Sequence, residues 1–264
     1  MEGGKIEIKS LFYITMNILI TNDDGITAKG IEIIAKKLQK SHNILVVAPD
    51  SQKSASSHSI TLRSPLMVKK EKIEGVEAPC FSVSGTPVDC TKIAITTITK
   101  EKIDIVVSGI NDGFNLGTDV IYSGTVSAAV EGALNRTPAI ALSCDGNEES
   151  YEVAADYAEK ILNEIKSEDI GNTVLNVNIP SINKEKIKGL KVCKIGERNY
   201  NNVYVEVEKS DNHVVYKITG SPDDALQDDT DVDMIKEGYV TVTPLHYDLT
   251  NFNLITRIKG ILEK

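Results

Sequence analysis

The sequence predicts an α/β fold: a doubly wound, mainly parallel β-sheet with a β-hairpin appended toward the C-terminus. Three observations support this prediction. Short apolar runs bounded by turn residues recur through the first two thirds of the chain, and continuous rather than alternating hydrophobicity is typical of strands that are covered on both faces. Helical patterns lie between these runs, which implies right-handed crossovers between parallel strands. The later strands alternate apolar and polar residues instead.

The strands of the parallel sheet are predicted at 17–21, 44–48, 105–108, 139–143 and 174–178. Helices are predicted at 29–40, 125–134 and 151–166, none of which contains proline. The first of them places Ile31, Ile34, Ala35 and Leu38 on one face, the spacing of an amphipathic helix that packs on a sheet.

After residue 178 the pattern changes to alternation. The segments 203–209 and 213–219 flank a polar turn and predict an antiparallel hairpin within an appendage at about 195–225. Because a lone two-stranded ribbon is marginally stable, we expect a partner subunit to cover it, the alternative being that it folds back on its own core. The acidic stretch at 221–233 is expected to be a solvated loop rather than a metal site. A strand at 239–243 and a helix at about 250–263 follow.

Length and composition limit the possible functions. The 264 residues suit one domain at 16–264, preceded by an extension at 1–15, with Met16 as an alternative start. The 29 basic and 38 acidic residues give a formal charge of -9, which argues against binding to a nucleic-acid duplex. The four cysteines form no CxxC pair, as expected in the reducing cytoplasm. No apolar run reaches the roughly 20 residues of a membrane helix, and no signal-peptide pattern is present.

Polar residues follow three of the predicted strands. Asp23 and Asp24 follow the first, Ser54 lies in the segment after the second, and Asn111 follows the third. In open α/β sheets these strand ends line the ligand crevice. Adjacent carboxylates repel each other, and a divalent cation relieves that repulsion. Oxygen donors of this kind suit Mg²⁺ or Mn²⁺. The alternative for the aspartate pair is capping of the next helix, but the four donors together favour a metal.

The segment 122–125 (YSGT) opens a predicted helix, and unpaired backbone N–H groups at a helix N-terminus attract anions such as phosphate. Ordinary capping by Ser123 or Thr125 is the alternative. A cation beside such a terminus is what hydrolysis of a phosphate ester requires. The motifs GxxxxGK[ST], GxGxxG and GxSxG are absent from the sequence, which argues against P-loop, dinucleotide-binding and serine-hydrolase chemistry. Asn22 stands where haloacid-dehalogenase-type phosphatases need a nucleophilic aspartate.

Several blocks together resemble the SurE survival-protein family of metal-dependent nucleotidases. They are ILITNDDGI (18–26), VVAPDSQKSASSHSIT (46–61), VSGTPVDC (83–90), VVSGINDGFNLGTDVIYSGTVSAAVEGAL (106–134), NVNIP (176–180) and VTPLHYDLT (242–250). The resemblance implies a Rossmann-like core and a cytoplasmic 5′-nucleotidase that hydrolyses nucleoside 5′- and 3′-monophosphates. It also implies one Mg²⁺ or Mn²⁺ per subunit and a homodimer or homotetramer that the hairpin helps to build.

The resemblance also assigns residues. It puts the metal ligands on Asp23, Asp24, Ser54 and Asn111, the same four that the strand ends select. Phosphate contacts fall on these last two and on Asn22, Ala55, Asn115, Ser123, Gly124 and Thr125. We expect attack by a water that the metal activates, with Asp23 or Asp24 orienting or deprotonating it and with no covalent intermediate. Ser57 departs from the family, which commonly has glycine there.

Two roles stay open at this stage. His58 is the nearest candidate for protonating the leaving alkoxide, and the alternative is that it braces the Ser54 loop by hydrogen bonds. Phe114 could cover a nucleobase or pack beneath its loop. With no Trp, nine Tyr and four Phe, we expect weak base recognition and broad specificity. Two other functions share the same site: a nucleotide or phosphate sensor with little turnover, and an enzyme acting on polyphosphate or on phosphomonoesters in general.

Overall fold

The computed structural model describes residues 15–165, 170–201, 203–224 and 227–263. The expected N-terminal extension lies outside these residues except for Thr15. Within them, nine strands form one mixed sheet in the order β3-β4-β2-β1-β5-β6-β7-β13-β8. The pairs β3–β4 and β7–β13 are antiparallel and all other pairs are parallel, which confirms the predicted mainly parallel α/β sheet.

The strands of this sheet are short, and those that the sequence predicted begin and end within two residues of the predicted bounds, except that β5 ends four residues later. They are β1 (Asn17–Thr21), β2 (Asn43–Pro49), β3 (Val68–Glu71), β4 (Cys80–Val83), β5 (Ile105–Asp112), β6 (Ala139–Cys144), β7 (Val174–Asn178), β8 (Leu190–Val192) and β13 (Val240–Leu245). The sequence analysis did not predict β3, β4 and β8. The mostly exposed β3 (VKKE) at one edge carries too few apolar residues to stand out, and β8 is only three residues long.

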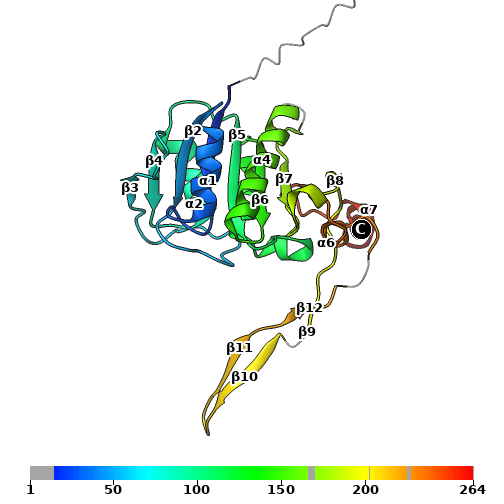
Figure 1. The fold of residues 1–264 in the computed structure, drawn as a ribbon. Helices are drawn as coiled ribbons and strands as arrows, with labels where there is room; N and C mark the ends of the chain where they lie inside the picture. Colours follow the sequence, from blue (N-terminus) through cyan, green and yellow to red (C-terminus); the bar gives the residue numbers. More distant parts are fainter. Residues whose placement is uncertain (1–14, 166–169, 202, 225–226, 264) are drawn as a thin grey trace, which may run out of the picture.

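Helices cover both faces of the sheet (Figure 1). Helices α1 (Lys29–Leu38) and α4 (Glu148–Glu164) pack together on one face, and α2 (Pro87–Ile93) and α3 (Gly124–Leu134) pack together on the other. Alternate residues of β1 supply the two cores, because Ile18 and Ile20 join the cluster under α1 and α4 while Leu19 joins the opposite one. This two-sided burial explains why the central strands are continuously apolar.

The topology places a ligand crevice beside β1. The chain leaves β1 for β2 on one side and returns at β5 on the other, and both neighbours are parallel to β1. Such a switch in direction opens a crevice at the carboxyl ends of the strands. β5 extends to Asp112, four residues beyond its predicted end, with an irregular register between Ser108 and Asn111. The carboxyl ends of β1 and β5 therefore lie at the same edge of the sheet.

The acidic stretch differs from the expected solvated loop at its C-terminal end. Helix α6 (Asp231–Lys236) begins there, and Asp231 is completely buried. Its carboxylate accepts hydrogen bonds from the backbone N–H groups of Gly117 and Gly196, both at 2.9 Å. Asp231 thus ties the 3-10 turn η2 (Gly117–Ile121) to the segment that leads into the hairpin, a role that sequence spacing did not reveal.

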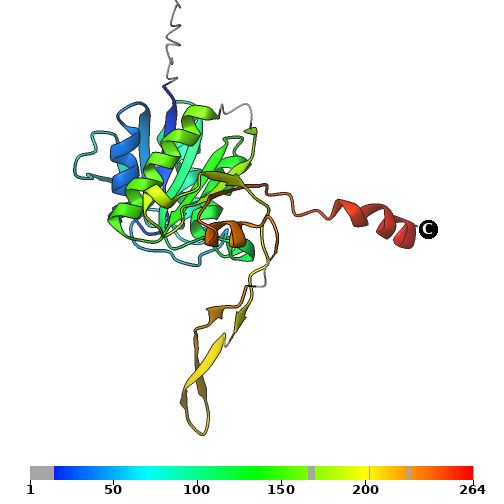
Figure 2. The ribbon, with the colours of Figure 1, turned by 45° about the vertical axis from the view of Figure 1, so that its right-hand side comes forward.

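The hairpin and the last helix project from the body. β10 (Tyr204–Lys209) and β11 (Val214–Ile218) pair antiparallel, as predicted, and extend well below the sheet (Figure 1). The short pair β9 (Tyr200–Asn201) and β12 (Ser221–Pro222) forms their base. Helix α7 (Phe252–Leu262) points away from the body in Figure 2 and contains no buried residue. The π-helix η1 (Ala94–Ile98) and the 3-10 turn η3 (Lys184–Lys186) complete the described elements. Among the described helices, none is long and apolar enough to cross a membrane.

Candidate active site

A cavity of about 630 Å³ lies at the carboxyl ends of β1 and β5. Seven of the predicted site residues line it: Asp23, Asp24, Ser54, Ala55, Asn111, Asn115 and Ser123. They come from the β1–α1 turn, the loop after β2, the end of β5 and the start of α3. The fold therefore assembles in one place residues that lie up to 100 positions apart along the chain.

The turn after β1 is built by Asn22 and Gly25. The Asn22 side chain donates to the Gly25 carbonyl at 2.9 Å and accepts from the Gly25 N–H at 3.1 Å. Gly25 has φ +99°, a left-handed conformation that favours glycine. The Lys53 N–H donates to the Asp23 carbonyl at 2.7 Å and ties the loop after β2 to the same turn. Asn22 is completely buried and holds the turn; it does not line the cavity.

Asp23 is the more deeply placed of the two carboxylates, with 5% of its surface exposed. The Thr125 hydroxyl donates to its Oδ1 at 2.5 Å. Burial, reinforced by the charge of Asp24, raises the pKa of Asp23 to about 6 even though the Thr125 hydrogen bond lowers it. Gly124 lets α3 begin this close to Asp23, because a Cβ at this position would lie 2.8 Å from the Asp23 Cβ and from the Ser56 Oγ.

Asp24 connects the ends of β1 and β5. Its carboxylate accepts from the Gln52 side chain at 3.3 Å and from the Asp112 N–H at 3.2 Å. Burial raises the pKa of Asp24, and the Asp112 charge adds to the rise. Asn111 donates its amide nitrogen to the Gly113 carbonyl at 2.8 Å, which leaves the amide oxygen as the atom that can bind a cation.

These donors fit a hard divalent cation. The four predicted donors, which are the Asp23 and Asp24 carboxylates, the Ser54 hydroxyl and the Asn111 amide oxygen, line one cavity. The raised pKa values of Asp23 and Asp24 report negative charge that burial penalises. A divalent cation offsets that penalty and prefers oxygen donors of this kind. No cluster of three or more His, Cys, Asp or Glu side chains suited to a metal occurs in the described residues.

Several predicted residues have other contacts. Ser123 caps α3, its Oγ accepting from the Val126 N–H at 3.1 Å. The Asn115 side chain donates to the Ser143 hydroxyl at 2.8 Å. His58 does not line the cavity. Its Nε2 instead lies 3.1 Å from Oε2 of the buried Glu131. This geometry favours the bracing role for His58 over direct proton transfer to a leaving group. Gly124 and Thr125 lie behind the cavity wall, beside Asp23.

The sequence analysis missed the aromatic wall of the cavity. Tyr122 lines it from the body, and Tyr200 and Tyr204 line it from the base of the hairpin, together with Val203, Ile218 and Thr219. The Tyr200 hydroxyl donates to the Asp119 carboxylate, and the Arg198 guanidinium stacks 5.7 Å from the Tyr200 ring. Burial and this hydrogen bond raise the pKa of Tyr200 to about 12. The alternation of the hairpin strands was visible in the sequence, but nothing local indicated that their base reaches the cavity.

Phe114, the aromatic residue that the sequence analysis considered for base contact, packs with Leu116, Val232 and Ile235 in a small core cluster. It does not line the cavity. The structure therefore favours the packing alternative for this residue.

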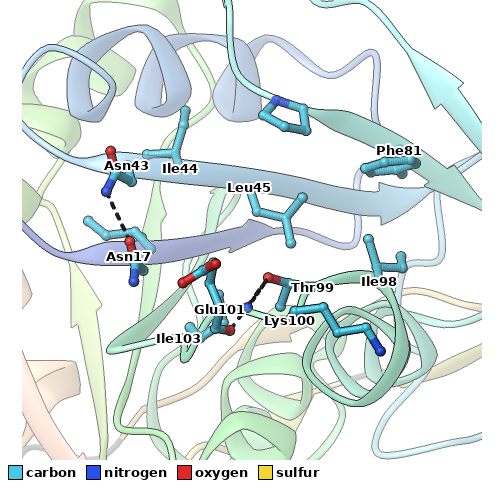
Figure 3. A pocket seen from close by; sticks show the side chains of 12 residues that line it. Asn17, Asn43, Ile44, Leu45, Phe81, Ile98, Thr99, Lys100, Glu101 and Ile103 are labelled. Atoms are coloured by element: carbon cyan, nitrogen blue, oxygen red, sulfur yellow. Dashed lines mark hydrogen bonds between the residues drawn. The ribbon is translucent and has the colours of Figure 1, made fainter.

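A second cavity of about 350 Å³ lies at the amino-terminal ends of the strands, opposite the first. Asn17 and Asn43, at the amino-terminal ends of β1 and β2, border it and are hydrogen-bonded to each other, and Ile44, Leu45 and Phe81 form its apolar wall (Figure 3). Because ligands of open α/β sheets bind at the carboxyl ends of the strands, the larger cavity is the candidate active site.

Taken together, the switch-point crevice, the paired carboxylates and the adjoining start of α3 define an α/β protein whose candidate site carries oxygen donors suited to a cation beside a helix N-terminus suited to an anion. The family model for "Survival protein SurE" matches residues 18–202. A "5'-nucleotidase SurE" from Clostridium botulinum (strain Eklund 17B / Type B) is 51% identical over 253 residues, covering 94% of this chain and all of the relative. A "5'-nucleotidase SurE" from Clostridium beijerinckii is 46% identical over 254 residues with the same coverage.

A solved structure supports the same conclusion. The SurE protein from Aquifex aeolicus matches with a TM-score of 0.78 and 38% identity, covering 93% of this chain and 99% of that one. The chain therefore belongs to the SurE family, as the sequence resemblance implied.

Proposed function

We propose that this protein is a metal-dependent 5′-nucleotidase that hydrolyses nucleoside 5′- and 3′-monophosphates to nucleoside and phosphate. The observation that carries the proposal is the pairing of the buried Asp23 and half-buried Asp24 carboxylates with the N-terminus of α3 at one cavity. Family membership and the "5'-nucleotidase" names of relatives about half identical to this chain support the same activity.

Asp23, Asp24, Ser54 and Asn111 are the residues that would hold one Mg²⁺ or Mn²⁺ per subunit. Their oxygen atoms suit these ions, and the family resemblance assigns the same four. When bound, the cation supplies a Lewis acid that neutralises phosphate charge and lowers the pKa of a water nucleophile. The backbone of Ala55 and the start of α3 offer donors to the other phosphate oxygens.

The remaining residues orient these groups. Thr125 holds the Asp23 carboxylate through its hydroxyl, which fixes one oxygen of a side chain that lines the cavity. Asp24, less buried than Asp23, is our candidate for orienting or deprotonating the attacking water. Asn22 holds the turn that carries both aspartates, and Asn115 and Ser123 form part of the cavity wall.

The nucleoside would contact the aromatic wall. Tyr204 and Tyr122 are 66% and 64% exposed within a cavity that is otherwise lined largely by polar side chains. Aromatic faces stack with every nucleobase, so such a wall gives affinity with little base preference. This supports the expected broad specificity, with Tyr side chains in the role that the sequence analysis considered for Phe114.

We take residues 16–264 as a single domain. The exposed apolar surface of helix α7 supports a homodimer or homotetramer of this domain. Along α7, Phe252, Leu254, Ile255, Ile258 and Ile261 are each between 39% and 62% exposed. With Leu262, which is 75% exposed, six exposed apolar residues lie on one projecting helix, which is unusual for a monomer. A cytoplasmic location is supported by Cys80, Cys90, Cys144 and Cys193, all of which are free and buried.

The experiment that tests the function is phosphate release from nucleoside 5′- and 3′-monophosphates, short polyphosphate and an aryl phosphate, with Mg²⁺, Mn²⁺ or EDTA. Wild type is compared with Asp24→Asn, which keeps the size of the side chain. We expect hydrolysis of the nucleotides that EDTA and the substitution both abolish, with the fold retained. Tight nucleotide binding without release under any metal would show a sensor and overturn the proposal; faster release from polyphosphate would reassign the substrate.

A further inference from the structure

The loop after β2, residues 51–59, carries Ser54 and Ala55 into the candidate active site in an unfavourable backbone conformation. Ala55 has φ +53° and Ser57 has φ +50°, and residues other than glycine pay free energy for this left-handed region. Glycine would escape this cost at position 57, but Ser57 does not. The loop therefore needs contacts from the body of the protein to keep this conformation.

The body holds the loop at several points. Backbone hydrogen bonds join Lys53 to Asp23 at 2.7 Å and Ser57 to the Tyr122 carbonyl at 3.1 Å. The Thr86 hydroxyl donates to the Ser59 carbonyl at 2.7 Å. The His58 imidazole adds a side-chain contact, with its Nε2 3.1 Å from Oε2 of Glu131. This contact joins residues 73 positions apart and links the loop to α3, the helix whose N-terminus borders the site.

Glu131 is a buried carboxylate on a helix of small and apolar residues. Only 3% of its surface is exposed, and Lys92 of α2 and Asn135 bind its Oε1 at 3.1 and 2.9 Å. Burial by itself raises the pKa of Glu131, but the hydrogen bonds from His58, Lys92 and Asn135 outweigh it and hold the pKa below its ordinary value of 4.5. Glu131 is thus ionised at neutral pH and is a strong acceptor for the His58 N–H.

We propose that Glu131 is a positioning residue for hydrolysis: acting through His58, it holds the 51–59 loop so that Ser54 and the Ala55 backbone stay against Asp23 and the start of α3. The proposal rests on the proposed function of the cavity. In this proposal the His58 side chain acts by donating a hydrogen bond to Glu131, and it transfers no proton to the substrate. A different side chain that donates a hydrogen bond from the same position should therefore substitute for histidine, and a side chain that cannot donate should not.

The test compares His58→Ala, which removes the donor, with His58→Gln, whose amide nitrogen reaches about as far as the imidazole Nε2. Lys92→Met is the matched control, because it removes another partner of Glu131 without touching the loop. The readouts are Mn²⁺ affinity by calorimetry without substrate, the rate of tryptic cleavage after Lys53, and kcat and its pH profile on a nucleoside 5′-monophosphate.

We expect His58→Ala to weaken Mn²⁺ binding about tenfold or more, as is typical when a partner that orients metal ligands is removed, to speed tryptic cleavage and to lower kcat. His58→Gln and Lys92→Met should keep Mn²⁺ affinity within about threefold of wild type, and His58→Gln should keep the pH profile. Unchanged Mn²⁺ affinity and cleavage in His58→Ala would overturn the proposal. So would a His58→Gln variant that binds Mn²⁺ normally but loses kcat with an altered pH profile, because His58 would then be the general acid.

The two proposals fail in different ways. If wild type hydrolyses nucleotides and Asp24→Asn does not, the proposed function stands whatever His58→Ala does. If wild type binds Mn²⁺ but releases no phosphate, the proposed function fails, while the effect of His58→Ala on Mn²⁺ affinity and on tryptic cleavage still tests the loop. Glu131→Gln adds a second variant. If it folds, its Mn²⁺ affinity, tryptic cleavage and kcat should change in the same direction as those of His58→Ala. If it does not fold, the variants of the solvent-accessible His58 test the proposal.

Discussion

The buried Asp23 carboxylate makes a specific prediction for stability in the absence of metal. Its pKa is raised from the ordinary 3.8 to about 6 by burial and by Asp24, so the folded state binds the proton more tightly than the unfolded state does. At about 1.4 kcal/mol for each pH unit, this rise corresponds to a penalty of about 3 kcal/mol for the ionised form. The penalty is absent below about pH 3.8, grows as the pH rises, and is complete above about pH 6.

Asp23→Asn removes that penalty at similar volume and keeps an acceptor for Thr125. In EDTA we therefore expect the variant to be about 3 kcal/mol more stable than wild type at pH 8, and the difference to shrink to less than about 1 kcal/mol near pH 4. Urea denaturation followed by circular dichroism at both pH values measures it. Asp50→Asn, which removes a 41% exposed carboxylate at the end of β2, is the matched control and should change stability little.

Adding Mg²⁺ should reverse the order of stability. A cation that binds only the folded state stabilises it in proportion to the logarithm of its concentration over Kd, so Mg²⁺ should stabilise wild type and have little effect on Asp23→Asn. An equal difference between the two proteins at pH 4 and pH 8, or no difference at pH 8 in EDTA, would refute the reasoning about burial. If Mg²⁺ stabilises wild type and Asp23→Asn equally, Asp23 is not a metal ligand.

Three further predictions follow from the packing and the surfaces. Tyr204→Ala should raise KM for nucleoside monophosphates about tenfold, the loss expected for a stacked base, while inhibition by inorganic phosphate stays unchanged; equal KM in steady-state kinetics would exclude the wall, and a preference above about a hundredfold for one base would contradict broad specificity. Ile258→Asp, on the exposed face of α7, should lower the oligomeric mass measured by light scattering. An unchanged mass would show that α7 does not hold the subunits together. Gly30→Ala should cost about 1–3 kcal/mol or more, because its Cβ would lie 2.1 Å from the Ile110 carbonyl oxygen; Gly260→Ala, with open space around it, is the control, and similar melting temperatures for the two variants would contradict the steric argument.

The strands and helices were predictable where local pattern and burial agree. The five apolar runs became the central strands because each is covered by helices on both faces, and periodicity over a few residues records that burial. The polar β3 and the short α2 were missed, since an exposed edge strand and a seven-residue helix carry little periodic signal. The acidic stretch was misjudged for a related reason: composition indicates solvation, whereas the burial of Asp231 depends on N–H groups of two distant segments.

By itself the sequence predicted the α/β class and selected the group of oxygen donors, because these follow from the apolar runs and from the residues directly after each strand, whereas the strand order and its switch point came from the structure. Only the tertiary structure decided that the hairpin base brings Tyr200 and Tyr204 to the cavity and that His58 meets Glu131. Contacts across 73 or more positions depend on how elements pack, and a lone histidine or tyrosine carries no local sign of its partner. The physical reason is the distance along the chain over which each effect acts. Hydrophobic periodicity and turn chemistry depend on residues a few positions apart, whereas side-chain pairing across the fold depends on residues far apart in the sequence.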